Sequence, residues 1–346
     1  MKIAIRYFTG TGNTARACSI AAKEFEAAGY TVDTQELRAA MPSPYIGIEG
    51  ADLLLVAFPV LGFSPPVTLL RWLARLPKQK GAKAATLAIG GATYLGDRYI
   101  PGWGADAAFS AARSLRRRGR EILGIGETSY PDNFTQVTNP PTEKQCAAIR
   151  QINDPTVAKF VKKLIDHMKN SGPKPMLKRS KKIRVPFAAI AFLFRWFGRP
   201  TLARTYVSDD SCTGCGLCAR NCPARAIKLR RGRPSWNLRC VACNRCINIC
   251  PSKSILTSSV ALALHLLFAI FTFALALSLP LPRELLTPAR AGIRILLLIA
   301  FFIVQIGPLS FLLRFLARNE KSHSLFEASF TKKFRRYKAE ELKTRE

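Results

Sequence analysis

Short apolar runs alternate with longer mixed stretches along the first 170 residues of the chain. The apolar runs predict strands, and the longer stretches predict helices. Expected strands are Lys2–Phe8, Thr31–Leu37, Ala51–Phe58, Lys83–Ile89 and Glu121–Thr128. Expected helices are one that ends near Gly29 and others at Pro66–Leu76, Ala105–Arg118 and Glu143–Lys169. This alternation predicts an α/β domain, residues 1–170, with a doubly wound parallel sheet.

Two longer apolar segments lie near the C-terminus. Val260–Leu281 has 22 residues with one histidine and no charge, and Ile295–Leu313 has 19 residues with only Gln305 strongly polar. Both are long enough to cross a bilayer as helices. Prolines between them favour a turn. We therefore expect a hydrophobic helical hairpin over 258–316, the alternative being two buried or interfacial helices.

A shorter apolar segment lies within residues 171–205. Ser171 to Arg184 is rich in Pro, Lys and Arg, which is typical of a linker, and Val185–Phe197 follows as VPFAAIAFLFRWF. Thirteen residues are too few to span a bilayer. The segment fits two alternatives: a helix in the membrane interface with Trp196 near the boundary, or a helix that docks the following domain onto the first.

A loop rich in glycine and threonine joins the first expected strand to the first expected helix. Its residues are Thr9, Gly10, Thr11, Gly12, Asn13 and Thr14. Glycines let backbone N–H groups point inward, the helix N-terminus adds partial positive charge, and hydroxyls donate further hydrogen bonds. No lysine of the Walker type follows, so this is not a nucleoside triphosphate loop. The pattern predicts a phosphate site, the alternative being a plain strand–turn–helix joint.

The run YFTGTGNTAR resembles the FMN-phosphate loop of flavodoxins, whose pattern is Thr/Ser-x-Thr-Gly-x-Thr. Thr9, Thr11, Gly12 and Thr14 match the pattern, and Asn13 fills its variable place. The resemblance extends over about 1–170. It implies a flavodoxin-like sheet of order 2-1-3-4-5, with FMN at the carboxyl ends of strands 1, 3 and 4.

Two further loops are expected at those strand ends. One runs from Phe58 to Pro66 and the other from Gly90 to Gly96. In flavodoxins such loops hold the isoalloxazine ring, although the usual tryptophan is missing from the first loop here. Phe63, Tyr94, Tyr99 and Trp103 could stack on the ring or simply pack. With the phosphate loop, the residues expected to bind FMN include Pro59, Gly62, Phe63, Gly90, Gly91 and Tyr94.

Eight of the ten cysteines lie in two copies of one pattern, C-x2-C-x2-C-x3-C-P, 28 residues apart. Three cysteines on a tight loop reach three corners of a 4Fe–4S cubane, and the fourth ligand comes from the other copy. This assigns cluster I to Cys212, Cys215, Cys218 and Cys250, and cluster II to Cys240, Cys243, Cys246 and Cys222. Small or left-handed-tolerant residues between the ligands turn backbone N–H groups toward sulfur. Structural zinc is disfavoured because it prefers paired CxxC motifs, and disulfides because no secretory signal precedes the chain.

The two cysteine runs align without a gap, and Ser208–Thr257 resembles the bacterial two-cluster ferredoxin. The resemblance implies a small α+β 2×4Fe–4S ferredoxin domain at 206–257. The whole chain then resembles the family of ferredoxins with an N-terminal flavodoxin-like domain. The C-terminal hairpin departs from the short form of that family.

The net charge of the chain limits the kinds of partner that we expect. The net charge is +31, and residues 171–257 carry 18 Lys/Arg against 2 Asp/Glu. A basic surface attracts nucleic acid, anionic lipid or an acidic protein. The cluster motifs and the hairpin favour anionic membrane lipid and an acidic redox partner protein, with no nucleic acid.

Charge also predicts an orientation for the hairpin. FMN and iron–sulfur clusters are loaded in the cytoplasm, so the N-terminal domains stay there. The segment 317–346, an expected basic cytoplasmic tail, carries nine Lys/Arg and stays inside by the positive-inside rule, although Arg283 and Arg290 lie between the spans. Two membrane spans place the N-terminal domains and the C-terminal segment on the same side. We therefore expect the protein at the cytoplasmic face of the cell membrane.

No Ser-His-Asp or Cys-His set stands out among the three histidines, which disfavours nucleophilic hydrolysis. We expect a membrane-associated electron-transfer protein that relays electrons between FMN and two 4Fe–4S clusters. One alternative is a membrane-bound flavin/iron–sulfur oxidoreductase that acts on a quinone, for which His265 in the first span is a candidate contact. Another is a flavodoxin fold without flavin that only docks partners.

Overall fold

A parallel sheet forms the centre of the N-terminal domain in the computed structural model, which describes residues 1–39, 48–178, 180–280, 287–317 and 319–344. Its strands, in spatial order, are β2 (Thr31–Glu36), β1 (Lys2–Tyr7), β3 (Leu53–Pro59), β4 (Lys83–Leu95) and β6 (Glu121–Pro131). Since β6 is the fifth parallel strand along the chain, the expected order 2-1-3-4-5 is confirmed.

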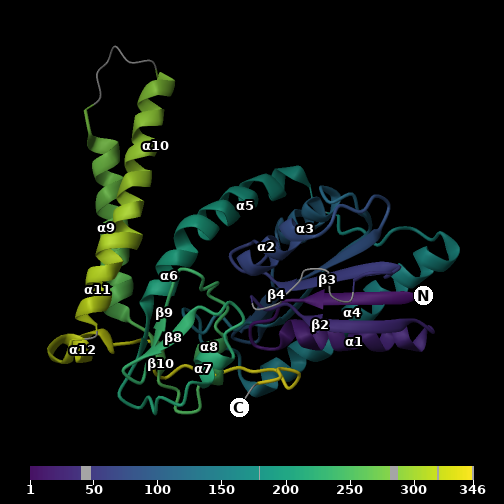
Figure 1. Ribbon diagram of the computed structural model, residues 1–346, viewed down its shortest axis with the longest axis horizontal. Helices are drawn as coiled ribbons and strands as arrows, with labels where there is room; N and C mark the ends of the chain where they lie inside the picture. Colours follow the sequence, from purple (N-terminus) through teal and green to yellow (C-terminus); the bar gives the residue numbers. More distant parts are fainter. Residues whose placement is uncertain (40–47, 179, 281–286, 318, 345–346) are drawn as a thin grey trace.

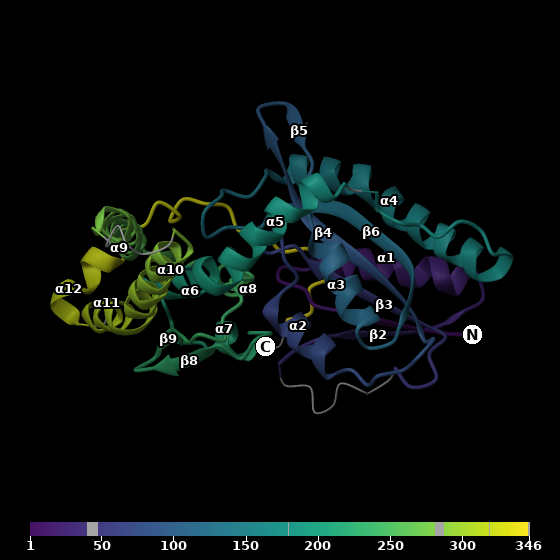
Figure 2. The same ribbon diagram turned by 90° about the horizontal axis from the view of Figure 1, so that it is seen from above.

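Helices cover both faces of this sheet (Figures 1 and 2). Helices α1 (Asn13–Ala27) and α4 (Glu143–Asn170) pack on one face, and α2 (Val67–Arg75) and α3 (Ala107–Arg116) pack on the other. Leu53 to Phe58 of β3 are buried without exception because the central strand has helices on both sides. Cys18 is buried in the core between α1 and the sheet, as expected of a structural thiol.

The prediction of a loop at Gly90–Gly96 is wrong. Strand β4 continues through Leu95 and pairs with β6 as far as Ala92 opposite Pro131, and then forms a hairpin with β5 (Arg98–Ile100). The turn between Leu95 and Arg98 has two residues, Gly96 (φ 60°) and Asp97. A Gly-Asp pair between two strand-forming runs is a hairpin signal, so the sequence contained the information.

Two short antiparallel pairs make up the domain that carries the paired cysteine runs. Strand β7 (Tyr206–Ser208) pairs with β10 (Ile255–Thr257), and β8 (Ile227–Arg230) pairs with β9 (Arg233–Trp236). Each cysteine run supplies one short helix, α7 (Leu217–Arg220) or α8 (Arg245–Ile249), which contains its third cysteine. The pseudo-symmetry expected from the sequence is therefore present in the fold.

Residues 181–205 are helical rather than a plain linker. They form α5 (Lys181–Leu193), a π-helical turn η1 (Phe194–Gly198) and α6 (Arg199–Thr205). Arg184 forms an ion pair with Asp106 (Nε–Oδ1 2.9 Å), and its guanidinium lies 4.0 Å from the centre of the Phe109 ring. One face of α5 thus docks on the N-terminal domain, which is one of the two alternatives for this segment.

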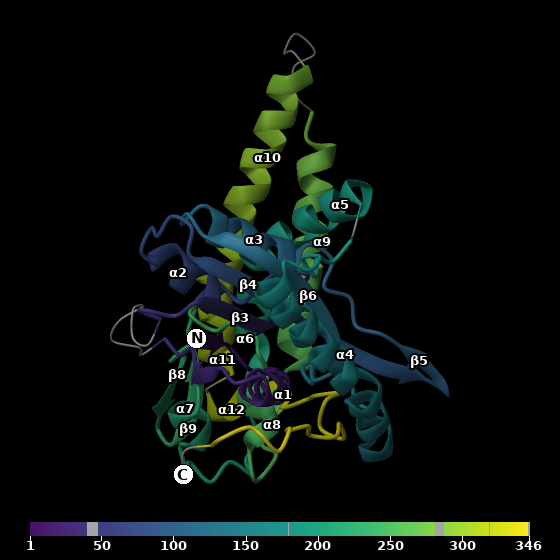
Figure 3. The same cartoon turned by 90° about the vertical axis from the view of Figure 1, so that its right-hand side faces the viewer.

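The two apolar C-terminal helices form an arm that extends away from the body (Figures 1 and 3). They are α9 (Ser259–Ser278) and α10 (Thr287–Val304), which continues through η2 (Gln305–Leu309) and α11 (Ser310–Leu316). Both are long and apolar enough to cross a membrane, with mean hydropathy 2.5. The connecting residues 281–286, with Arg283, lie outside the described residues.

The segment expected to be a basic tail packs instead against both domains. After α12 (Glu320–Phe326) the chain returns along the cysteine-rich domain, where the Thr257 N–H donates to Thr331 Oγ1 (3.1 Å). Tyr337, Ala339 and Leu342 are buried. Apolar and aromatic residues interleaved with the basic ones explain the difference, because they can be buried while the charges remain at the surface.

Candidate redox centre

The eight cysteines of the two runs gather into two groups. Cys212, Cys215, Cys218 and Cys250 line one small enclosed space together with Gly214 and Pro251. Cys250 enters this group from the second run, so the structure brings together the four residues assigned to cluster I. The exchange of the fourth ligand follows from the packing of α7 against α8.

Cys222 lies with the other three cysteines. Burial raises the pKa of the Cys246 thiol, and the neighbouring Cys240, Cys243 and Cys222 raise it further. Burial likewise raises the pKa of Cys240, as do Cys243 and Cys222. These mutual effects place the four sulfurs assigned to cluster II in one electrostatic environment.

The sulfur spacing does not suit a single small ion. Four thiolates around one zinc at about 2.3 Å would lie about 3.8 Å apart. Among the described residues, the one set of three metal-ligating groups within 4.8 Å of one another is Asp210, His323 and Glu327, which contains no cysteine. A cubane, whose four corners are separated, does not need its thiolates so close together.

Backbone N–H groups point at the sulfurs, as a cluster requires. Ala226 N–H donates to Cys222 Sγ (3.2 Å) and Ala242 N–H donates to Cys240 Sγ (3.4 Å). The small or left-handed-tolerant residues between the ligands turn the backbone as expected, and four of them have positive φ: Gly214, Gly216, Ala242 and Asn244. The residues present therefore fit two iron–sulfur clusters.

The phosphate loop also has the expected geometry. Gly12 (φ 105°) is the N-cap of α1, in a conformation that favours glycine, and its N–H donates to Thr9 Oγ1 (3.1 Å). Asn133 donates to Thr11 Oγ1, and Asn13 Nδ2 donates to the Pro131 carbonyl (2.8 Å). Thr14 is fully buried, and its hydroxyl has no hydrogen-bond partner in the described part of the chain. An unpartnered buried hydroxyl at a helix N-terminus fits a phosphate ligand.

The loop that carries Cys243 of cluster II lies directly against the phosphate loop. A Cβ added at Gly10 would lie 2.5 Å from the Cys243 carbonyl oxygen, so the two loops touch. Arg245 is 1% exposed; it donates to the carbonyls of Thr9 (2.9 Å) and Gly10 (2.8 Å) and forms an ion pair with Glu36. This arginine lies between two cluster ligands in the sequence, and sequence reasoning missed its role because nothing local reveals Glu36 as its partner.

The loops expected to hold the isoalloxazine ring are covered by protein atoms. A Cβ at Gly62 would lie 2.1 Å from the Phe194 ring, and one at Gly90 would lie 3.0 Å from Gly102. Phe63 packs against Phe187 with ring centres 4.8 Å apart. The ring end of the expected FMN site therefore does not fit as arranged. The phosphate loop is also covered, because a Cβ at Gly12 would lie 2.8 Å from the Ala339 side chain, but it keeps the buried Thr14 hydroxyl without a hydrogen-bond partner in the described part of the chain.

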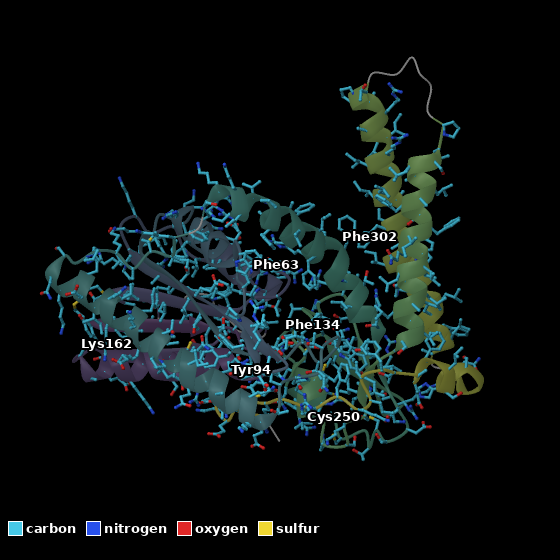
Figure 4. All side chains as sticks on the ribbon, turned by 180° about the vertical axis from the view of Figure 1, so that it is seen from behind. Phe63, Tyr94, Phe134, Lys162, Cys250 and Phe302 are labelled. Carbon is cyan, nitrogen blue, oxygen red and sulfur yellow. The ribbon has the colours of Figure 1, made fainter. Side chains whose placement is uncertain are left out.

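The four aromatic candidates form two packed pairs: Phe63 with Trp103 (ring centres 6.4 Å apart) and Tyr94 with Tyr99 (5.7 Å). Tyr94 lies on the β4–β5 hairpin, opposite Tyr99 on the paired strand, and Figure 4 labels both Tyr94 and Phe63 in the N-terminal domain. Trp103 packs against Phe187 (4.3 Å). Pro59 is the last residue of β3, paired with Ile89, and Gly91 faces Asp132. Packing by the protein's own residues accounts for all four aromatic candidates.

A cavity of about 920 Å³ opens on the other side of the phosphate loop. It reaches from Thr9 and Ala15 to Cys222, an expected ligand of cluster II. Its walls also include the ends of β1 and β2 and part of the C-terminal segment, with the charged side chains Glu36, Arg38, Arg220, Arg225, Glu341 and Lys343. This cavity therefore borders one residue of each expected cofactor site.

Comparison with known proteins identifies the cysteine-rich domain. Residues 211–255 match the family of 4Fe-4S dicluster domains. No curated protein matches the chain.

Solved structures similar to the N-terminal half include the Streptococcus pneumonia TIGR4 flavodoxin, with 18% identity over 48% of this chain and 98% of that one and a TM-score of 0.34. A flavodoxin from the domain Archaea has 15% identity over 47% and 99% of the chains (TM-score 0.30). The Treponema denticola general stress protein 14, solved in complex with FMN, has 18% identity over 48% and 98% (TM-score 0.29).

The strand order defines the class of the first domain, and the family match defines that of the second. The chain joins a flavodoxin-like parallel sheet to a 4Fe-4S dicluster domain and two apolar C-terminal helices. It is an electron-transfer protein by this architecture.

Proposed function

We propose that this protein relays electrons between FMN and two 4Fe–4S clusters at a membrane surface. The contact between the phosphate loop and the cluster II loop carries the proposal: Arg245 and the Cys243 carbonyl lie directly on Thr9 and Gly10. Electron transfer needs cofactors held close together, and two hydrogen bonds from Arg245 join these loops while its ion pair with Glu36, at the end of β2, holds the arginine in place.

The phosphate loop would bind FMN by its phosphate. The N-terminus of α1 and the Thr14 hydroxyl offer donors to an anion, and the loop is closed to water by its burial. When bound, FMN exchanges electrons singly or in pairs, whereas each cluster passes only one electron at a time. The side chains of this site hold the cofactor and exclude water.

The eight cysteines would hold cluster I and cluster II in the two groups described above. Cluster II is the nearer to the phosphate loop, because Cys243 belongs to its set and touches Gly10. Cluster I, whose Cys215 is exposed, would face solvent. We infer the order FMN, cluster II, cluster I, with an acidic protein partner at the exposed end.

Two apolar helices and a strongly basic chain support a membrane location. The hairpin α9–α10 would anchor the protein, and basic residues would meet anionic lipid at the cytoplasmic face. His265 is buried beside Gln305, whose amide donates to the His265 carbonyl (2.9 Å), a contact that joins the two helices.

Electron exchange within the protein tests the relay. Anaerobic protein carrying FMN is titrated by visible absorbance and electron paramagnetic resonance, and is then given a pulse of a one-electron reductant without mediator. Flavin and clusters should reach the distribution that the titration defines. Cofactors that titrate separately but never exchange electrons would refute the relay. Turnover with a soluble quinone alone would favour the oxidoreductase alternative.

A further inference from the structure

The outer face of α5 and η1 is apolar and exposed, which is unusual for a helix docked on a domain. Val185 is 67% exposed and Trp196 is 58% exposed. Four more large apolar residues are exposed along the same segment: Ile183, Ile190, Phe192 and Leu193. The outer face of α4 is instead charged, as water requires, and its exposed residues include Lys159, Lys162 and Lys163. Figure 4 labels Lys162 on this helix.

The inner face fixes the orientation of this helix. Arg184, Phe187 and Arg195 recur at helical spacing and all contact the N-terminal domain; for example, Arg195 Nη2 donates to Ser64 Oγ (2.9 Å). The docking leaves Val185, Phe192 and Trp196 on the outside, since they are also one or two turns apart. The exposed stripe is therefore set by specific packing on the opposite side.

The chain that follows α5 contacts the hairpin. The rings of Phe197 in η1 and Phe302 in α10 lie 4.1 Å apart, and α6 packs against α9. Arg204 Nη2 donates to the Ile306 carbonyl (3.4 Å). Figures 1 and 3 show α5 leaving the base of the hairpin on the side toward which the hairpin projects. The segment that follows α5 therefore packs against the base of the apolar arm, which places α5 beside it.

We propose that α5 and η1 lie in the membrane interface, with the stripe Val185–Trp196 in contact with lipid. The inference rests on the proposed membrane location of the hairpin and commits to a lipid bilayer as the occupant. Trp196 would lie at the boundary, and the exposed Lys181 and Lys182 would meet anionic headgroups. Both roles that the sequence suggested for this segment would then apply, because the helix docks on the N-terminal domain with one face and binds lipid with the other.

This arrangement orients the flavodoxin-like domain. Phe187 and Phe194, on α5 and η1, cover Phe63 and Gly62 at the ends of the sheet. A helix held in the interface would therefore hold the phosphate-loop end of the domain near the membrane surface, instead of leaving the domain to swing on its connection.

Cross-linking to lipid tests the proposal on the full chain. The purified protein is placed in nanodiscs that contain phosphatidylglycerol and a phospholipid with a diazirine on its acyl chain, illuminated, and mapped by mass spectrometry. Adducts are expected on the peptide that contains Phe192 and Trp196 as well as on α9 and α10. Leu95, which is 76% exposed on the β4–β5 hairpin, is the matched apolar control and should carry none.

Charge substitution sharpens the result. The variant Val185→Asp with Phe192→Asp should lose the α5 adducts and keep those on α9 and α10, with iron content unchanged, because both residues are exposed. The variant Leu95→Asp should keep every adduct. Adducts on the hairpin but not on α5 in the wild type would overturn this inference and leave the anchor intact. Adducts on neither would overturn the membrane location too, and α5-to-α5 protein cross-links would show that a second copy covers the stripe.

Discussion

The two expected cofactor sites differ in how they are built. All cluster ligands lie between Cys212 and Cys250, and the structure gathers them into the two sets that the spacing predicts. The FMN site draws on three strand-end loops, and other parts of the chain cover all three, with Ala339 of the C-terminal segment lying over Gly12 of the phosphate loop. A site encoded in one short segment can be read from its spacing, whereas a site shared among distant loops depends on what packs over them.

Substitution of single cluster ligands should have the largest effect and should separate the two cofactor sites most clearly. Cys215→Ala and Cys243→Ala should each lower the iron content from about eight to about four per chain, because one cubane needs all four thiolates. Only Cys243→Ala should also weaken FMN binding, since Cys243 touches Gly10. Iron analysis and flavin titration on anaerobic protein measure both effects.

Each variant serves as the control for the other. If both variants changed FMN binding equally, the contact between the cluster II loop and the phosphate loop would be contradicted. Iron that stays near eight in either variant would contradict the ligand assignment.

Arg245→Met should be the next largest effect. It leaves the Glu36 carboxylate short of a partner and removes the donors from the Thr9 and Gly10 carbonyls. Breaking a buried ion pair costs about 3–5 kcal/mol. Anaerobic urea unfolding measures the free energy of unfolding, and Arg239→Met, at an exposed arginine of the same domain, is the control. Equal stability of the two variants would contradict a buried interdomain role for Arg245.

Thr14→Val probes the phosphate end alone. The Thr14 hydroxyl is buried without a partner, so its removal should leave the FMN-free protein as stable as before or slightly more stable. With FMN present the lost hydrogen bond to an anion should weaken binding by about 1.5–3 kcal/mol. Fluorescence titration of FMN measures this loss.

Thr86→Val is the matched control for Thr14→Val. The Thr86 hydroxyl, on β4, donates to the Ala108 carbonyl of α3 (3.2 Å) and should not affect FMN. If Thr14→Val and the wild type bound FMN equally, the phosphate site would be wrong.

Gly62→Ala should have the smallest effect of the set. The added Cβ meets the Phe194 ring, and the left-handed backbone (φ 54°) costs about 1–2 kcal/mol for any L-residue. Combining it with Phe194→Ala should restore part of the stability, which thermal unfolding measures. If the double variant still binds FMN as the wild type does, Gly62 serves the docking of α5 rather than a flavin ring.

The sequence predicted most of the sheet because buried strands and their helices are read from local pattern. The Cys-x2-Cys spacing is also a local property, and the structure brings the cysteines together in the two groups that this spacing predicts as ligand sets. Sequence reasoning missed the extension of β4, although Gly96-Asp97 signalled a hairpin, because Gly90 and Gly91 suggested a loop. It could not reveal that Arg245 would reach Glu36, since 209 residues separate them and only the packed domains bring them together.

The C-terminal segment makes the same point. Its lysines and arginines predict a solvated tail, yet the Tyr337 hydroxyl donates to Asn13 Oδ1 (2.6 Å) and Ala339 N–H donates to the Thr11 carbonyl (2.8 Å). Composition records the charges but not the neighbours of the few apolar residues among them. The phosphate loop is thus bounded by residues from both ends of the chain.

Cofactor content is the most direct test of the central claim, that one chain holds both kinds of redox group. Iron, sulfide and flavin per chain would be measured on anaerobically purified protein in detergent, with a visible spectrum, before and after addition of FMN. The account predicts about eight iron, about eight sulfide and one FMN. Eight iron with no flavin, even after FMN is added, would contradict it and make the flavodoxin-like domain a docking scaffold.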